Sequence, residues 1–159
     1  MLRLLRYGMM GLWWFGLVLA VQAQEVRQEI RFPDLPGYRT LVCDFHMHTV
    51  FSDGSVWPPI RAKEAWRQGV HVIAITDHIE YQPHKDDLPT KHNRPYELLT
   101  GESASRDILL IRGAEITRDT PPGHFNALFL KDAAALDQPD LMEVFRRAIE
   151  QGAFLFWNH

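Results

Sequence analysis

The run VHVIAIT at residues 70–76 constrains the fold of this chain more than any other segment. It is almost continuously apolar and rich in β-branched residues, which is typical of a strand that is buried on both faces. Such strands occur in parallel sheets, whose faces are covered by the helices that connect one strand to the next. The run therefore indicates an α/β fold.

Strand and helix patterns alternate along the rest of the chain. Further strands are predicted at residues 41–48, 107–117, 124–130 and 153–159. Helices are predicted at residues 60–69, 96–106 and 141–152, with prolines before the first of them and a glycine at the end of the first and third. Because helices connect the strands, we expect parallel pairing through right-handed crossovers, in an open sheet or in a barrel.

The N-terminus has the layout of a secretory signal peptide. Arg3 and Arg6 precede an apolar run at residues 9–21, and small Ala23 suits a cleavage site. The run is shorter than the roughly 20 residues that cross a bilayer, so a retained membrane anchor is the less favoured alternative. Contact with a membrane is expected only through this segment. We therefore expect a periplasmic or secreted protein with a signal peptide at 1–23, a leader at 24–40 and one domain at 41–159.

The composition narrows the classes of ligand and partner. The formal net charge is −3 and the pI is about 6.2, without a basic patch, so nucleic acid is not an expected partner. Cys43 is the one cysteine, which excludes an internal disulfide and any site built from several cysteines. A metal site in this chain would have to use histidine, aspartate and glutamate, and the sequence contains eight histidines.

The stretch DFHMHTVFSDG at residues 44–54 places two histidines at the end of a predicted strand. Residues two apart share one face of a strand, so Asp44, His46 and His48 point the same way and the two imidazoles can converge on one ion. Taken alone, the stretch favours an ordinary strand whose histidines pack or face water.

Four other motifs reverse this interpretation. ITDH ends the second predicted strand, GAEIT ends the third, and GHFN and WNH add a histidine at the boundaries of the fourth and fifth. In α/β folds, chemistry is placed at the carboxyl ends of the strands. Because every predicted strand brings a histidine or a carboxylate to one rim, we predict a metal site there. Imidazole and carboxylate ligands without thiolate suit Zn, Mn or Fe.

In their order and approximate spacing, these motifs resemble the PHP family (polymerase and histidinol phosphatase). The resemblance covers residues 41–159, and the stretches HMHTVFSDGSVWP, TDHIEYQPHK and GAEITRDTPPGHFNA look like an exported phosphodiesterase branch of that family. It implies an α/β fold of the distorted (β/α)7 type, similar to a TIM barrel. It also implies two or three divalent metal ions at the C-terminal rim of that barrel.

The resemblance further implies more βα units and a late Asp-x-His pair beyond His159. We therefore expect the N-terminal part of a longer protein, with an incomplete barrel and an exposed edge on its last strand. We also expect this part to hold little metal and to be inactive by itself.

Seven residues are implied as metal ligands, in three pairs and one bridge: His46 with His48, Asp53 with His78, Glu115 as the bridge, and His124 with His159. Asp44, Asp77 and Asn158 look like groups that orient the imidazoles, and Asp77 is placed with Arg118 among the catalytic residues. The planar guanidinium of Arg118 could clamp a phosphoryl oxygen. The alternative for Arg118 is an exposed arginine on a loop.

The implied activity is the hydrolysis of a phosphate ester, with a small-molecule phosphodiester as the expected substrate. Metal ions neutralise the phosphoryl oxygens and turn a bound water into a hydroxide that attacks phosphorus, so no side-chain nucleophile is needed. One alternative is an exported module that binds a metal or another ligand without catalysis. Another is an amidohydrolase, which is less favoured because no strand end offers a lysine for carbamylation.

Overall fold

The structure, a computed structural model, describes residues 25–159. Its strands are β1 (Cys43–Met47), β2 (Val72–Ile75), β3 (Leu109–Ile116), β4 (Phe125–Leu128) and β5 (Phe154–Trp157). Its helices are α1 (Pro58–Arg67), α2 (Arg94–Ser105), α3 (Leu141–Glu150) and the short 3-10 helix η1 (Ala133–Leu136). Every predicted strand and helix is present, and η1 is an addition. The predicted signal peptide lies outside the described residues.

The strands form one sheet in the order β1-β2-β3-β4-β5. β1, β2 and β3 are parallel, but β4 is antiparallel to both β3 and β5. The expectation of parallel pairing throughout is therefore wrong for β4. The connection from Ile116 to Phe125 contains no helix, and a parallel return needs a crossover of about a dozen residues or more. As a result, the start of β4 lies at the same rim as the ends of β1, β2, β3 and β5.

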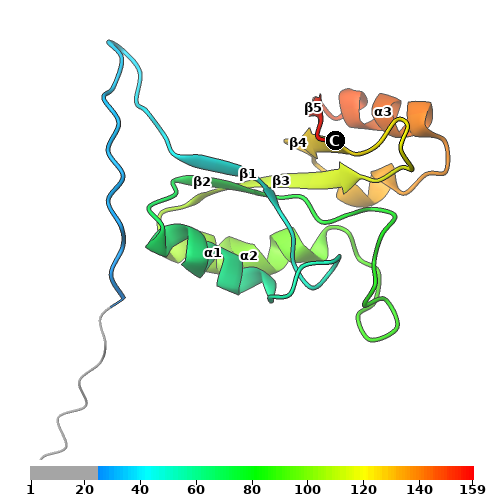
Figure 1. Ribbon diagram of the computed structural model, residues 1–159, viewed down its shortest axis with the longest axis horizontal. Helices are drawn as coiled ribbons and strands as arrows, with labels where there is room; N and C mark the ends of the chain where they lie inside the picture. Colours follow the sequence, from blue (N-terminus) through cyan, green and yellow to red (C-terminus); the bar gives the residue numbers. More distant parts are fainter. Residues whose placement is uncertain (1–24) are drawn as a thin grey trace, which may run out of the picture.

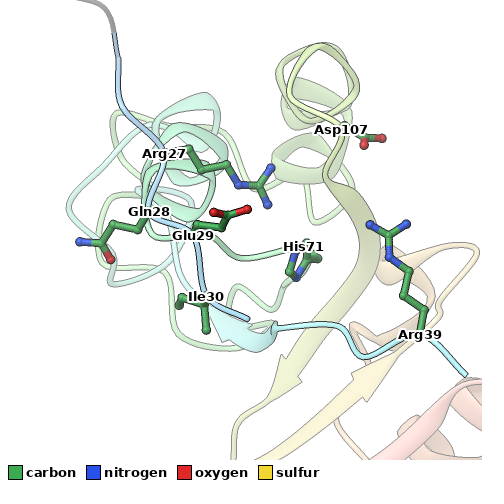
Figure 2. Close-up of a pocket in the computed structure, with 8 residues that line it drawn as sticks. Arg27, Gln28, Glu29, Ile30, Arg39, His71 and Asp107 are labelled. Atoms are coloured by element: carbon green, nitrogen blue, oxygen red, sulfur yellow. The ribbon is translucent and has the colours of Figure 1, made fainter. Parts of the chain in front are cut away.

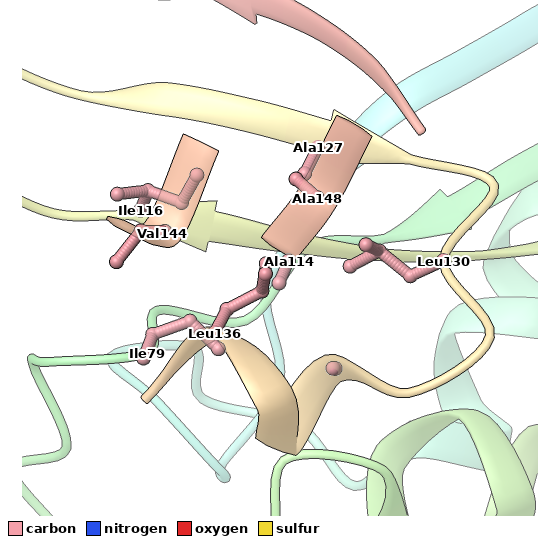
Figure 3. Packing of buried hydrophobic residues seen from close by; sticks show 9 residues of the cluster. Ile79, Ala114, Ile116, Ala127, Leu130, Leu136, Val144 and Ala148 are labelled. Atoms are coloured by element: carbon pink, nitrogen blue, oxygen red, sulfur yellow. The ribbon is translucent and has the colours of Figure 1, made fainter. Parts of the chain in front are cut away.

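In Figure 1, α1 and α2 lie along β1, β2 and β3, and α3 lies beside β4 and β5. α1 and α2 pack on β2 through a cluster that includes Ala62, Leu99, Ile73 and Ile75. α3 and η1 pack on β3 and β4 through a second cluster, which Figure 3 shows around Ala114, Ile116, Ala127, Val144 and Leu136. Leu110 of β3 packs against the first cluster, while Ala114 and Ile116, an even number of residues further on, belong to the second. All three helices therefore lie on the same side of a curved sheet.

The opposite face is concave and is the interior of a half-barrel. Val72, Ala74, Ile111 and Leu128 are buried there as a third apolar cluster. The Asn126 side chain donates a hydrogen bond to the carbonyl of Phe45 at 3.3 Å, although two strands separate β4 from β1 in the sheet. Such a contact requires a strongly curled sheet. The predicted class, an α/β fold with an incomplete TIM-like barrel, is confirmed.

The leader contacts the amino-terminal end of the sheet. The backbone N–H of Gln28 donates to the carbonyl of Arg67 at 2.7 Å, and Glu25 accepts from Arg67 at 2.6 Å. Beside it lies a cavity of about 420 Å³, which Figure 2 shows between Arg27, Arg39 and His71. His71 accepts a hydrogen bond from the backbone N–H of Val42 at 2.9 Å, in keeping with a structural role. Within residues 25–159, no helix is both long and apolar enough to cross a membrane.

Candidate metal centre

Glu115 is the centre of the predicted site. It lies on β3, faces the interior of the half-barrel and is 1% exposed. Its Oε2 atom is 3.1 Å from the Nε2 atoms of both His46 and His48, and 3.3 Å from Nδ1 of His78. These three histidines come from the ends of β1 and β2. One carboxylate oxygen therefore faces three imidazoles that are far apart in the sequence.

The other oxygen of Glu115 faces the antiparallel part of the sheet. Its Oε1 atom is 3.1 Å from Nδ1 of His124 and 3.9 Å from Nε2 of His159. The side-chain amide of Asn158 donates to the same oxygen at 3.0 Å and to Asn126 at 3.0 Å. His124 is placed here because β4 starts at this rim, and the backbone N–H of His124 donates to the carbonyl of His159 at 2.8 Å.

The turn after β1 carries Asp53 to the centre. Its Oδ1 atom lies 3.4 Å from Nδ1 of His48 and 3.5 Å from Nε2 of His78. Gly54 makes this turn possible, since a Cβ atom at that position would lie 2.6 Å from backbone atoms of His48 and Thr49. The Asp-Gly turn therefore positions Asp53, a predicted ligand, next to His48 and His78.

Asp77 fixes this turn through three hydrogen bonds. Its carboxylate accepts hydrogen bonds from the backbone N–H of Thr49 at 2.6 Å, from the Thr49 hydroxyl at 2.7 Å and from the Ser52 hydroxyl at 2.6 Å. Ser52 Oγ is in turn 3.2 Å from Nδ1 of His48. Asp77 thus reaches an imidazole through Ser52, whereas the carboxylate of Asp44 accepts from the backbone N–H of His46 at 3.1 Å.

The donor atoms fit divalent metal ions. Ligand atoms lie within 4.8 Å of one another in three groups: His46, His48 and Glu115; His48, Asp53 and His78; and His78, Glu115 and His124. Imidazole nitrogens and carboxylate oxygens in such numbers suit Zn, Mn or Fe. Each of His48, His78 and Glu115 belongs to two of these groups, so the groups overlap more than the predicted pairs do. His159, at 3.9 Å from Glu115, lies at the margin of the centre.

The protonation of these residues is set by burial and by their mutual contacts. Burial opposes ionisation of Glu115, but hydrogen bonds from His48 and Asn158 and the charge of His78 hold its pKa well below the usual range. Burial lowers the pKa of His78, and the charge of Glu115 offsets this only in part. Burial would also lower the pKa of His48, but its hydrogen bond to Glu115 raises that pKa above the ordinary value. The carboxylate of Glu115 is therefore ionised at neutral pH.

Arg118 uses its guanidinium outside this centre. It pairs with Glu80 and donates to the backbone carbonyls of Thr117 at 2.8 Å and Gln138 at 3.1 Å. It also lines a cavity of about 450 Å³ together with His124. Arg118 therefore lies near the predicted ligand His124, but its guanidinium donates to Glu80 and to the two backbone carbonyls.

Two residues of the site had no signal in the sequence. Asn126 is fully buried and links Asn158 to β1, and Tyr81 stands beside His78 at a ring distance of 5.7 Å. Asn126 occupies the last position of the GHFN motif, but a single amide in a short strand has no periodicity that marks its role. Tyr81 lies in a long polar loop, where its neighbours in space cannot be inferred from spacing.

Comparison with solved structures identifies the fold. A two-domain protein from Bacteroides vulgatus, which contains a predicted PHP-like metal-dependent phosphoesterase, matches this chain with a TM-score of 0.83 and 55% sequence identity. The match covers 86% of this chain and 40% of that chain. A candidate metal-dependent phosphoesterase from Bifidobacterium adolescentis is 29% identical over 57% of this chain and 27% of its own, with a TM-score of 0.42, too low to carry an argument.

Sequence comparison is less extensive. An uncharacterised protein of Methanocaldococcus jannaschii is 36% identical over 78 residues, which are 49% of this chain and 34% of that protein. No family model matches the chain. The chain thus spans less than half the length of each relative that it matches. The resemblance to the PHP family that the motifs indicate is thus confirmed as a structural match, at 55% identity, to a protein that contains a predicted PHP-like metal-dependent phosphoesterase.

Proposed function

We propose that this protein is a metal-dependent phosphoesterase that acts on phosphodiesters, with two or three divalent ions at the centre around Glu115. The observation that carries the proposal is one buried carboxylate with its two oxygens directed at histidines from three strand boundaries. The Bacteroides relative, which contains a predicted metal-dependent phosphoesterase, supports the type of reaction. The preference for diesters rests on the resemblance of the sequence motifs to a phosphodiesterase branch.

Some residues of the site would bind the ions, and others would orient the residues that bind them. His46, His48, Asp53, His78 and His124 would hold the ions, with Glu115 shared between them. When bound, the ions supply positive charge that neutralises phosphoryl oxygens and acidifies a water molecule. Asp77 and Ser52 hold the imidazole of His48 in one orientation, and Asn158 does the same for Glu115.

The first test replaces the shared carboxylate. Glu115→Gln keeps the shape of the side chain and removes its charge, so we expect metal affinity to fall by about tenfold or more. Metal affinity is measured by competition with a chelator, and hydrolysis with bis-nitrophenyl and mono-nitrophenyl phosphate. Because the chain spans 40% of the Bacteroides relative, hydrolysis is measured on the whole product of the gene.

The matched control is Glu150→Gln, which removes an exposed carboxylate from α3 and should leave both properties unchanged. Loss of metal and of diester hydrolysis in the Glu115 variant alone supports the proposal. Tight metal binding by a protein that hydrolyses neither ester would instead favour the non-catalytic binding module. Unchanged hydrolysis in the Glu115 variant would refute its shared role.

A further inference from the structure

Tyr81 is an exposed aromatic residue next to the metal centre. Its side chain is 52% exposed, and its ring meets the ring of His78 edge-on, with centroids 5.7 Å apart and an angle of 74°. Exposed tyrosines are common on protein surfaces, and Tyr38, which is 77% exposed in the leader, needs no explanation. Tyr81 differs because it touches a predicted ligand.

The backbone before Tyr81 is fixed. His78 forms a parallel bridge with Glu115, and the N–H of Ile79 donates to the carbonyl of Glu115 at 2.9 Å. The carboxylate of Glu80 accepts from the backbone N–H of Thr117 at 2.7 Å and pairs with Arg118. This segment therefore continues the sheet beside the end of β3.

The residue after Tyr81 is fixed as well. The side-chain amide of Gln82 donates to the carbonyl of Ile79 at 3.3 Å and lies 3.1 Å from Nδ1 of His92. Its oxygen accepts from the hydroxyl of Thr90 at 2.6 Å. Tyr81 is thus held between two anchored neighbours, so the backbone that carries its ring is fixed before a ligand arrives.

Two cavities meet at this residue. One, of about 450 Å³, is lined by Tyr81, Glu80, Arg118 and His124, and the other, of about 560 Å³, by Tyr81, Glu80 and Gln82 among others. Volumes of this size accommodate small organic groups. The first cavity reaches His124, and so the metal centre. Because Glu80 and Arg118 pair with each other, the ring of Tyr81 offers apolar surface to the same cavity as this ion pair.

We propose that Tyr81 is a specificity-determining residue, whose ring stacks against a planar organic group on the phosphate ester while the phosphoryl group is held at the metal centre. This inference rests on the proposed function and deepens it, since it names the substrate class as esters that carry an aryl or similar planar substituent. Aromatic pairs prefer offset or edge-on contact, and the ring is exposed for either.

The experiment measures binding rather than turnover. The whole product of the gene is loaded with Mn²⁺ and titrated with phenylphosphonate and with methylphosphonate, which share the phosphoryl group but cannot be hydrolysed as esters. Wild-type protein should bind phenylphosphonate more tightly, and Tyr81→Ala should reduce that preference by roughly three- to tenfold. Tyr81→Phe should retain it. Tyr38→Ala is the matched control and should change nothing.

The outcomes separate this inference from the proposed function. A preference for phenylphosphonate that disappears in Tyr81→Ala and persists in Tyr81→Phe supports it. Equal binding of the two phosphonates by wild-type protein, or an unchanged preference in Tyr81→Ala, overturns the role of Tyr81 and leaves the proposed function intact. If neither phosphonate binds in a metal-dependent way, the proposed function fails and this inference fails with it.

Discussion

Asp77 lies beneath the turn that carries Asp53, and three hydrogen bonds from Thr49 and Ser52 end on its carboxylate. It is 8% exposed, so water cannot replace these bonds if they are lost. Asp77 fixes the shape of the turn and, through Ser52, the orientation of the His48 imidazole. A carboxylate can accept all three bonds at once, whereas an amide presents a donor where one of the two oxygens stood.

We therefore expect Asp77→Asn to lower the free energy of unfolding by about 1–3 kcal/mol. Urea denaturation of the metal-free protein measures this change without interference from bound ions. The control is Asp86→Asn, which makes the same substitution at an exposed position of the following loop. Equal stability of the two variants would show that the turn does not depend on Asp77.

Single residues also show what a sequence can and cannot reveal. His46 and His48 could be assigned together because a strand repeats every two residues, and both do face Glu115. Asn126 could not, because its partner Phe45 lies 81 residues away and nothing in the local pattern connects them. The donors of Arg118 could not be assigned either, since they depend on loops whose path only the folded chain defines.

At the scale of elements, two glycines make opposite demands on the chain. Gly101 lies inside α2 with open space around the position of a Cβ atom. Gly54 lies in the turn after β1, where a Cβ atom would overlap the backbone at His48 and Thr49. The first glycine weakens its helix, and the second allows its turn.

Gly101→Ala should therefore stabilise the protein by about 0.5–1 kcal/mol, because alanine has the higher helix propensity. Gly54→Ala should destabilise it and displace Asp53, which lowers metal affinity. The pair is compared by thermal unfolding and by chelator competition. The reasoning about Gly54 would be contradicted if that variant bound metal as tightly as Gly101→Ala does.

The sequence predicts the bounds of the helices and strands within a few residues, but it predicts the direction of strand pairing less well. Apolar periodicity marks a strand or a helix without stating the direction of its neighbour. The direction of β4 follows from the short connection after Ile116, and the prediction gave that connection too little weight. η1 was not predicted, because a 3-10 helix of four residues has no periodicity to detect.

At the scale of the whole molecule, the half-barrel leaves β5 at the edge of the sheet, with Phe154 61% and Trp157 68% exposed. The strand at the opposite edge of the sheet, β1, follows the leader. Glu25 of the leader pairs with Arg67 of α1 at 2.6 Å and with Arg106 at 3.0 Å. Within residues 25–159, the ion pairs of the leader therefore start at Glu25, close to the predicted cleavage site after Ala23. Removal of the signal peptide would leave both ion pairs intact.

We propose that the protein is exported and that its mature form begins at Gln24. When the chain is produced with its own N-terminus in a Gram-negative host, the processed protein should appear in the periplasm or medium with that first residue. N-terminal sequencing and cell fractionation test this. Ala23→Arg places a large charged residue at the cleavage site and should block processing. Cytoplasmic protein that retains Met1 in both forms would contradict export.

Glu115 belongs to two of the three ligand groups, and His48 and His78 connect those two groups to the third, so the candidate ion positions share ligands and would not fill independently. An ion held by Glu115 with His46 and His48 would draw on the same carboxylate charge as a second ion held with His78 and His124. Such linkage is reciprocal, so each ion alters the affinity of the other by the same factor. The binding isotherm of this protein should therefore depart from that of independent sites, with later ions bound more weakly than earlier ones.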